Sequence, residues 1–196
     1  MSEADEARAR ILELAEQFFL THGYSRVTMD DIATELRMSK KTLYRHFSSK
    51  EALGEAAIAS SFARINQELD VLLRDERLDF AERLRNLVRT VASHYGRAAP
   101  VLRDLQRDAP DLWQRLLEVR RASVQARFGA LLASGVKAGA IRADVEPRLV
   151  LRMVLTLVDQ LMRPDVLEEL ELPADQVFSN MLGVILDGLR IGRRRA

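Results

Sequence analysis

The helical spacing of the apolar residues is the feature that most limits what this chain can fold into. Along most of its 196 residues, apolar side chains recur three and four positions apart, which is the spacing of one face of an α-helix. The segment 5–21 has the clearest stripe, made by Ile11, Leu14, Ala15, Phe18 and Phe19. No segment alternates as a half-buried strand does. Leu, Ala, Arg and Glu dominate, and these residues favour helices, so the sequence predicts an all-α protein.

The expected helices are separated by prolines, glycines and short polar turns. We expect them at about 5–21, 28–36, 40–47, 49–75, 79–98, 101–107, 110–138, 146–163 and 174–191. Pro100 is expected to break the chain between two of them, because a proline removes a helical hydrogen bond. Thr28 with Asp31, and Ser48 with Glu51, have the spacing of capping boxes that would begin two of these helices.

The charges of the chain are unevenly distributed. It carries 30 Lys and Arg against 29 Asp and Glu, a net charge of +1, which by itself argues against a basic nucleic-acid binder. Residues 37–50, however, hold five basic side chains and no acid, whereas residues 1–36 hold three basic and eight acidic ones. Cysteine is absent, which excludes disulfides and thiolate metal sites. The acidic N-terminus does not resemble a signal peptide, and Arg152 interrupts the apolar stretch 149–158, so we expect a cytoplasmic chain that spans no membrane.

Two short helices, 28–36 and 40–47, follow a longer one and are joined by a turn of a few residues, which is the arrangement of a helix-turn-helix. On the second, Leu43 and Phe47 share a face and would pack against the preceding helices. Its other side chains are cationic or carry hydroxyl or imidazole groups: Lys40, Lys41, Thr42, Tyr44, Arg45 and His46. Such groups hold phosphates and reach base edges in the major groove. We therefore interpret this segment as a DNA recognition helix rather than a solvated basic face, with Lys50 able to hold another phosphate.

Residues 8–55 resemble the DNA-binding domain of the TetR family of one-component bacterial transcriptional regulators. The matching runs are Ile11–Phe19, His22–Tyr24, Val27–Ala33, Ser39–Phe47 and Ser49–Leu53. The resemblance implies an N-terminal three-helix DNA-binding domain, residues 1–54, with a helix-turn-helix. It also implies a C-terminal helical bundle, residues 55–196, that binds an effector and dimerises.

The resemblance further implies a role for each matching position. Phosphates would be held by Thr28, Tyr44, His46 and Lys50, and bases or nearby backbone would be met by Lys40, Lys41, Thr42 and Arg45. One departure concerns the turn, where the family commonly has glycine and this chain has Arg37. A residue other than glycine is strained in a left-handed turn. Either the turn is altered or Arg37 adds a phosphate contact.

The last two long helices are suited to dimerisation. A dimer reads two half-sites about one DNA turn (~34 Å) or a multiple apart. Wide apolar faces are formed by Val150, Val154, Leu157, Val158 and Leu161 on one helix and by Phe178, Met181, Leu182, Ile185, Leu186 and Leu189 on the other. Gly183 and Gly188 could allow a close helix approach. The alternative is that all these residues belong to an ordinary core.

An effector pocket should combine an apolar lining with a few polar groups. The candidate residues are Phe62, Asn86, His94, Tyr95, Gln106, Trp113, Met153 and Asp159. For each of them, ordinary packing or a surface hydrogen bond is the alternative. Asp159 lies among apolar residues, where an unpaired charge is costly, so it either pairs with Arg163 or faces a ligand.

Enzyme chemistry has little support in this sequence. The three histidines are dispersed without metal-site spacing, and neither a glycine-rich phosphate loop nor a nucleophile elbow is present. We expect no metal and no cofactor. The sequence predicts a homodimeric, ligand-responsive repressor that binds a palindromic, double-stranded operator and an unidentified small-molecule effector. The alternatives are an activator or constitutive DNA-binding protein without effector, and a helical ligand-binding protein or enzyme with a vestigial DNA-binding head.

Overall fold

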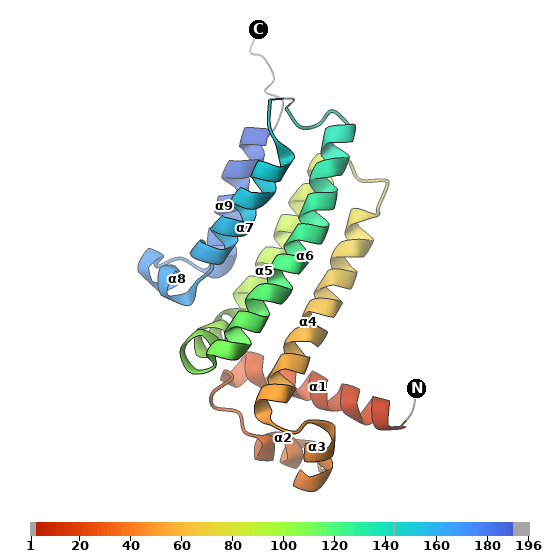
Figure 1. Ribbon diagram of the computed structural model, residues 1–196, viewed down its shortest axis with the longest axis vertical. Coiled ribbons are helices and arrows are strands. Elements are labelled where there is room, and N and C mark those ends of the chain that lie inside the picture. The colour runs from red at the N-terminus through yellow and green to blue at the C-terminus, as the bar shows by residue number, and fades with distance from the viewer. Residues whose placement is uncertain (1–2, 143, 190–196) are drawn as a thin grey trace. The chain divides into compact units, whose positions relative to one another are not determined.

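The computed structural model describes residues 3–142 and 144–189, and in these ranges the chain forms nine α-helices (Figure 1). They are α1 (Glu3–His22), α2 (Met29–Glu35), α3 (Lys40–His46), α4 (Lys50–Leu73), α5 (Phe80–Asp108), α6 (Pro110–Lys137), α7 (Pro147–Leu161), α8 (Pro164–Leu170) and α9 (Ala174–Leu189). The all-α prediction is confirmed. No helix within the described ranges is long and apolar enough to cross a membrane.

Contacts within the chain divide it into two compact units, which we call unit 1 and unit 2. Unit 1 consists of residues 1–65 and 97–119, and unit 2 consists of residues 66–96 and 120–196. The predicted DNA-binding segment 1–54 lies entirely within unit 1. Unit 1 also contains the segment in which α5 ends and α6 begins, although this segment is distant in sequence.

The core of unit 1 fixes its short helices. Ile11 on α1, Ile32 on α2 and Leu43 on α3 have no exposed surface, and Leu53 near the start of α4 is equally buried. Each of them lies on the apolar stripe of its helix. Burial of a side chain of this size contributes about 1.5–3 kcal/mol. Helices as short as α2 and α3 are not stable alone, so this shared core is what holds them.

In unit 2, α7 and α9 pack against each other. Val150, Val154 and Val158 recur at four-residue spacing on α7 and are buried, as are Phe178 and Leu182 on α9. This spacing places each set on one helical face. The two helices thus bury their inner faces within the chain itself.

Helix α5 differs from the prediction because it runs unbroken through Pro100. The proline cannot donate the hydrogen bond that would otherwise reach the Gly96 carbonyl. Leu102 and Leu105 are buried beyond it, so the apolar stripe continues past the proline and its burial outweighs the missing hydrogen bond. The predicted break at Pro100 is therefore wrong.

The chain after α7 also departs from the prediction. The predicted interruption at Pro164 is confirmed, because α7 ends at Leu161, but Pro164 occupies the first turn of α8, a helix that the sequence pattern does not predict. A proline is tolerated there because the first turn has no helical acceptor for its missing N–H. The final helix ends at Leu189 within the described residues. Positions 190 and 191, which the sequence pattern assigns to it, lie outside them.

Candidate DNA-binding interface

Side-chain caps fix the starts of the helices in the DNA-binding segment. The Thr28 hydroxyl accepts a hydrogen bond from the Asp31 N–H at 3.2 Å, and the Thr28 N–H donates to the Asp31 carboxylate at 2.8 Å, which confirms the predicted capping box. The hydroxyl and the N–H of Thr28 both donate to this carboxylate and lower the pKa of Asp31. At α4 the predicted cap is wrong by one residue, because Ser49 and not Ser48 accepts from the Ala52 N–H, at 3.1 Å.

The turn between α2 and α3 keeps a left-handed residue although it has no glycine. Arg37 has a φ of 52°. Its N–H donates to the Thr34 carbonyl at 3.0 Å, and the Met38 N–H donates to the Ala33 carbonyl at 3.0 Å. This pair of hydrogen bonds is a Schellman motif, the usual way for a helix to end on a left-handed residue. The turn is thus retained, and the strain falls on Arg37, whose side chain is exposed.

Helix α3 has one face in the core and the other in solvent. The Ser39 hydroxyl caps it by accepting from the Thr42 N–H at 3.0 Å. Leu43 and Phe47 are buried, as their spacing predicts, whereas Tyr44 is 47% exposed. A helix held on one side and polar on the other has the form that enters a major groove.

The cations of α3 differ in what they contact. Lys41 and Arg45 are exposed, and neither has a hydrogen bond or ion pair within the described residues. Lys40 forms an ion pair with Asp30 on α2, and this hydrogen-bonded carboxylate raises the pKa of Lys40. Because both side chains are more than half exposed, the pair is weak. Lys40 can therefore exchange this carboxylate for a phosphate, while His46 lies partly buried at the edge of the same face.

Lys50 is turned toward the protein. Its ammonium group donates to the Ser25 carbonyl at 3.3 Å and lies 4.3 Å from the centroid of the Tyr24 ring. Burial lowers the pKa of Lys50, and burial together with the nearby Glu51 raises the pKa of Tyr24 to about 12. Lys50 thus helps to hold the turn between α1 and α2. A phosphate contact would require its ammonium group to leave the Ser25 carbonyl.

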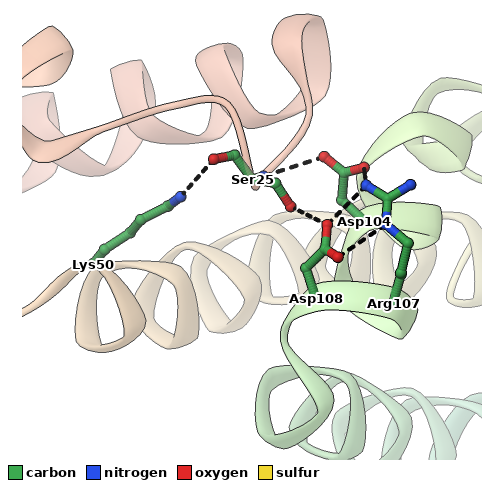
Figure 2. A network of polar contacts seen from close by, with 5 residues as sticks. All are labelled: Ser25, Lys50, Asp104, Arg107 and Asp108. Carbon is green, nitrogen blue, oxygen red and sulfur yellow. Dashed lines mark hydrogen bonds and ion pairs between the residues drawn. The ribbon is translucent and has the colours of Figure 1, made fainter.

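The end of α5 holds the same turn from the other side (Figure 2). The Ser25 N–H donates to the Asp104 carboxylate at 3.1 Å, and the Ser25 hydroxyl donates to Asp108 at 2.5 Å. Arg107 pairs with both acids, and its hydrogen bond, followed by that of Ser25, lowers the pKa of Asp108 to about 2. Gly23 has a φ of 82°, and a Cβ there would overlap a carboxylate oxygen of Asp104. Sequence reasoning missed these two acids because no local pattern connects them with a turn some eighty residues earlier.

The predicted effector residues do not all lie in one unit. Unit 1 holds Phe62, Gln106 and Trp113, whereas unit 2 holds Asn86, His94, Tyr95, Met153 and Asp159. Trp113 is buried, Met153 is 45% exposed and faces solvent, and His94 lies 3.1 Å from a Glu68 carboxylate oxygen. In the described part of the chain, no group of three or more His, Asp or Glu side chains is arranged to hold a metal ion.

Asp159 is held by two arginines of α6. The Nη2 of Arg120 donates to its Oδ1 at 2.8 Å, and the Nε of Arg121 donates to its Oδ2 at 2.6 Å. Arg163, one of the two alternatives that the sequence offered for Asp159, pairs with Asp165. The Asp159–Arg163 pair, one of the two alternatives that the sequence left open, is therefore not formed.

Arg120 is the interior residue that sequence reasoning missed. It lies four positions after Leu116, which is buried, and is itself 4% exposed. The signal was a cation on an apolar stripe of α6, matched by an acid on an apolar stretch of α7. Each charge is costly alone, so each of them indicates that a partner exists, but neither identifies the other.

The residues predicted for the dimer interface fall into two groups. Those buried within the chain are Val150, Val154, Val158, Phe178, Met181, Leu182 and Leu189. The remaining four, which keep part of their surface, are Leu157, Leu161, Ile185 and Leu186. The outer faces of α7 and α9 also expose Leu149, Met153 and Val184, which the sequence prediction did not include.

A family model described as "Bacterial regulatory proteins, tetR family" matches residues 11–57, the segment that contains the helix-turn-helix. Among curated proteins, the chain is 25% identical to the HTH-type transcriptional repressor DhaR of Mycobacterium sp. (strain GP1). This match covers 72% of this chain and 73% of DhaR.

Two solved structures share its architecture. The TetR family transcriptional regulator PfmR of Thermus thermophilus is 25% identical, with a TM-score of 0.60 over 94% of this chain and 100% of that one. The transcriptional regulator FadR of Bacillus subtilis, solved in complex with stearoyl-CoA, has a TM-score of 0.70 over 93% of this chain and 99% of that one. At 17% identity, the second likeness is one of fold.

Proposed function

Because the chain belongs to the TetR family of bacterial transcriptional regulators, we propose that it is a ligand-responsive repressor that binds a palindromic operator as a homodimer. Proteins of this family are regulators and not enzymes. The similarity to a mycobacterial repressor supports repression rather than activation. The protein acts in the cytoplasm, at the nucleoid when it is bound to its operator.

The exposed face of α3 is the observation that carries the DNA-binding part of this proposal. Lys41 and Arg45 have no hydrogen bond or ion pair within the described residues, and Tyr44 is 47% exposed. Such groups can bind phosphates and base edges without breaking an internal contact. The rest of the proposed DNA contact surface is Thr28, Arg37, Lys40, Thr42, His46 and Lys50.

A second copy of the chain is the proposed partner of the outer face of α7 and α9. Leu149, Met153 and Val184 are 59%, 45% and 78% exposed. A Cβ at Gly183 or Gly188 would meet no atom of the described residues within 4 Å, so packing among these residues does not require glycine at either position. A partner helix that approaches closely would require it. Exposed apolar side chains beside small residues favour a helix–helix contact between protomers.

Val184→Arg tests this dimer face, with Val71→Arg as the matched control because Val71 is 70% exposed on α4. We expect Val184→Arg to yield a monomer by light scattering coupled to size exclusion, and Val71→Arg to stay dimeric. If both variants stay dimeric, the proposed face is wrong.

Effector binding in unit 2 is proposed to change the separation or mobility of the two recognition helices. A ligand shifts such an equilibrium only if it prefers one state, and inverting a 99:1 population takes a preference of ~10⁴-fold. The hydrogen bonds from Ser25 to Asp104 and Asp108 support a route, since a displacement of the end of α5 would move the turn between α1 and α2. Lys50, which donates to the same turn, would move with it.

Selection of bound sequences from a random pool of double-stranded DNA tests the main proposal. We expect an inverted repeat whose half-sites lie about one helical turn or a multiple apart. Arg85→Ala, which removes an exposed cation from α5, should select the same repeat. Enrichment of no sequence would overturn the proposal, and operator binding that no metabolite or antibiotic in a broad panel releases would favour a constitutive DNA-binding protein.

A further inference from the structure

Arg120 is a buried cation whose hydrogen-bonding capacity is mostly unused. Its side chain is 5% exposed, and only its Nη2 is held by Asp159. The Nε and Nη1 atoms have no hydrogen-bond partner among the described residues. Buried donors of this kind are nearly always satisfied in folded proteins, so these two atoms call for an acceptor.

A second arginine on the same helix shows what a satisfied guanidinium looks like in this protein. Arg127, seven residues further along α6, donates from Nη2 to Asp70 at 3.0 Å and from Nε to the Asn66 carbonyl at 3.3 Å. It is also more exposed, at 17%. The Nε and Nη2 atoms of Arg127 thus both have acceptors within the chain. The Nε and Nη1 atoms of the more deeply buried Arg120 have none among the described residues.

The charges around Arg120 indicate what kind of acceptor is needed. Asp159 is shared between Arg120 and Arg121, so the three groups together carry one net positive charge. The Arg121 side chain is 61% exposed and its charge is solvated by water, whereas the charge of Arg120 is not. A monoanion would balance the cluster, and a dianion such as a phosphate ester would leave one negative charge buried.

The neighbours of Arg120 indicate the rest of the ligand. The buried Tyr95 side chain forms a hydrogen bond with Arg120 and lies close enough to Asp159 to interact with its charge. Its ring lies 5.1 Å from that of Phe178, which is buried on α9. Val158 beside Asp159 is buried as well. The cation therefore lies beside a buried aromatic pair in an apolar part of unit 2, which suits a ligand with one charged end and an apolar body.

We propose that Arg120 anchors the carboxylate of an apolar monocarboxylic acid, which binds in unit 2 as the effector. This inference rests on the proposed function, because the acid is taken to be the ligand of the ligand-responsive regulator. A carboxylate accepts charge-assisted hydrogen bonds from a guanidinium, and these are among the strongest polar contacts in proteins. The Nε and Nη1 atoms of Arg120 donate them, while Nη2 stays on Asp159.

Isothermal titration calorimetry of the full chain with straight-chain carboxylates from butanoate to dodecanoate tests the proposal. We expect saturable binding of one or more of these acids. The primary alcohol of the same chain length as the tightest acid should bind at least about tenfold more weakly, because it lacks the charge. If the alcohol binds as tightly as the acid, or if none of the acids binds, the proposal is overturned.

Three variants separate anchoring from a structural role. Arg120→Met should weaken binding of the tightest acid by about 30-fold, and Arg121→Gln, the matched neighbour in solvent, should change it by less than about threefold. Asp159→Asn should tighten it by about fivefold, because it removes the carboxylate that competes for the guanidinium. A merely structural Arg120–Asp159 pair would weaken binding in both variants, and that result would overturn the proposal.

Operator binding, measured separately by gel shift, distinguishes this inference from the proposed function. If the chain binds an operator but no carboxylate, the inference fails and the DNA-binding function stands. If it binds carboxylates through Arg120 but enriches no DNA sequence, the ligand site stands and the regulatory function fails.

Discussion

The cations of α3 and the cation of Arg120 lie in opposite environments. Lys41 and Arg45 stand in solvent without an ion pair among the described residues, and water screens each charge at little cost. Arg120 is shut away from water and depends on Asp159. Several positive charges can therefore lie side by side on a surface and remain available to bind a polyanion. In the interior, each charge needs its own partner. We therefore expect the number of exposed charges to determine DNA affinity on α3, and the pairing of charges to determine stability around Arg120.

The largest expected effect comes from removing the acidic partner in each region. Asp159→Val should lower the free energy of unfolding by about 3–5 kcal/mol, because Arg120 would be left buried and unpaired. Asp30→Val, which removes the exposed partner of Lys40, should change it by less than about 1 kcal/mol. Urea denaturation measures both values. Equal losses in the two variants would break the distinction between the regions.

Removing the cations of α3 should affect DNA binding and leave folding intact. Lys41→Ala combined with Arg45→Ala should weaken operator affinity by about 100-fold, since each base-edge contact is worth ~1–3 kcal/mol. The thermal unfolding midpoint should stay within about 2 °C of the parent, because neither side chain has an ion pair to lose among the described residues. Fluorescence anisotropy at fixed salt and differential scanning calorimetry supply the two readouts. A large drop in the midpoint would show that α3 is not an independent surface.

Relief of the strained turn should give a smaller effect of the opposite sign. Arg37→Gly should raise the free energy of unfolding by about 0.5–1 kcal/mol, because glycine adopts a φ of 52° without steric cost. Arg37→Asn should fall between the parent and the glycine variant, since asparagine tolerates this region better than arginine does. Chemical denaturation gives both numbers. A destabilised glycine variant would mean that the Arg37 side chain contributes more than its backbone strain costs.

The smallest expected effect concerns acid sensitivity at the α5 end. The folded-state pKa of Asp108 is about 2, below its ordinary value of 3.8. Its ionised form therefore stabilises the fold above about pH 4, and this contribution is lost as the pH falls toward 2. Asp108→Asn should show a shallower loss of stability over that interval than the parent chain, in urea titrations at a series of pH values. Identical slopes would exclude Asp108 as a source of acid sensitivity.

Local patterns were sufficient for the parts of the fold that local contacts determine. The apolar stripes and the Thr28–Asp31 box predicted α1 to α3 and the orientation of Leu43, because each depends on residues within a turn or two of one another. At Pro100 a local rule failed because tertiary burial of the following stripe was stronger than one lost hydrogen bond. The spacing of apolar residues therefore predicts helices reliably where no contact with a distant part of the sequence competes with it.

The polar pairs that define the interior could not be predicted in the same way. Ser25 meets Asp104 across 79 positions, and Arg120 meets Asp159 across 39. Spacing within a helix carries no information about such partners. What the sequence did contain was the anomaly of a charge on an apolar stripe, which marks that a partner exists without saying where it lies.

Unit 1 is discontinuous, since it needs residues 97–119 as well as the chain up to residue 65. In a hybrid regulator made by fusing only residues 1–54 to a foreign sensor domain, Ser25 would lose its hydrogen bonds to Asp104 and Asp108. Another side chain would then replace Asp104 next to Gly23. The transferable module is therefore two segments of sequence rather than one. A chimaeric regulator made from this chain should include the end of α5 together with residues 1–54, or should have acids equivalent to Asp104 and Asp108 introduced in the recipient.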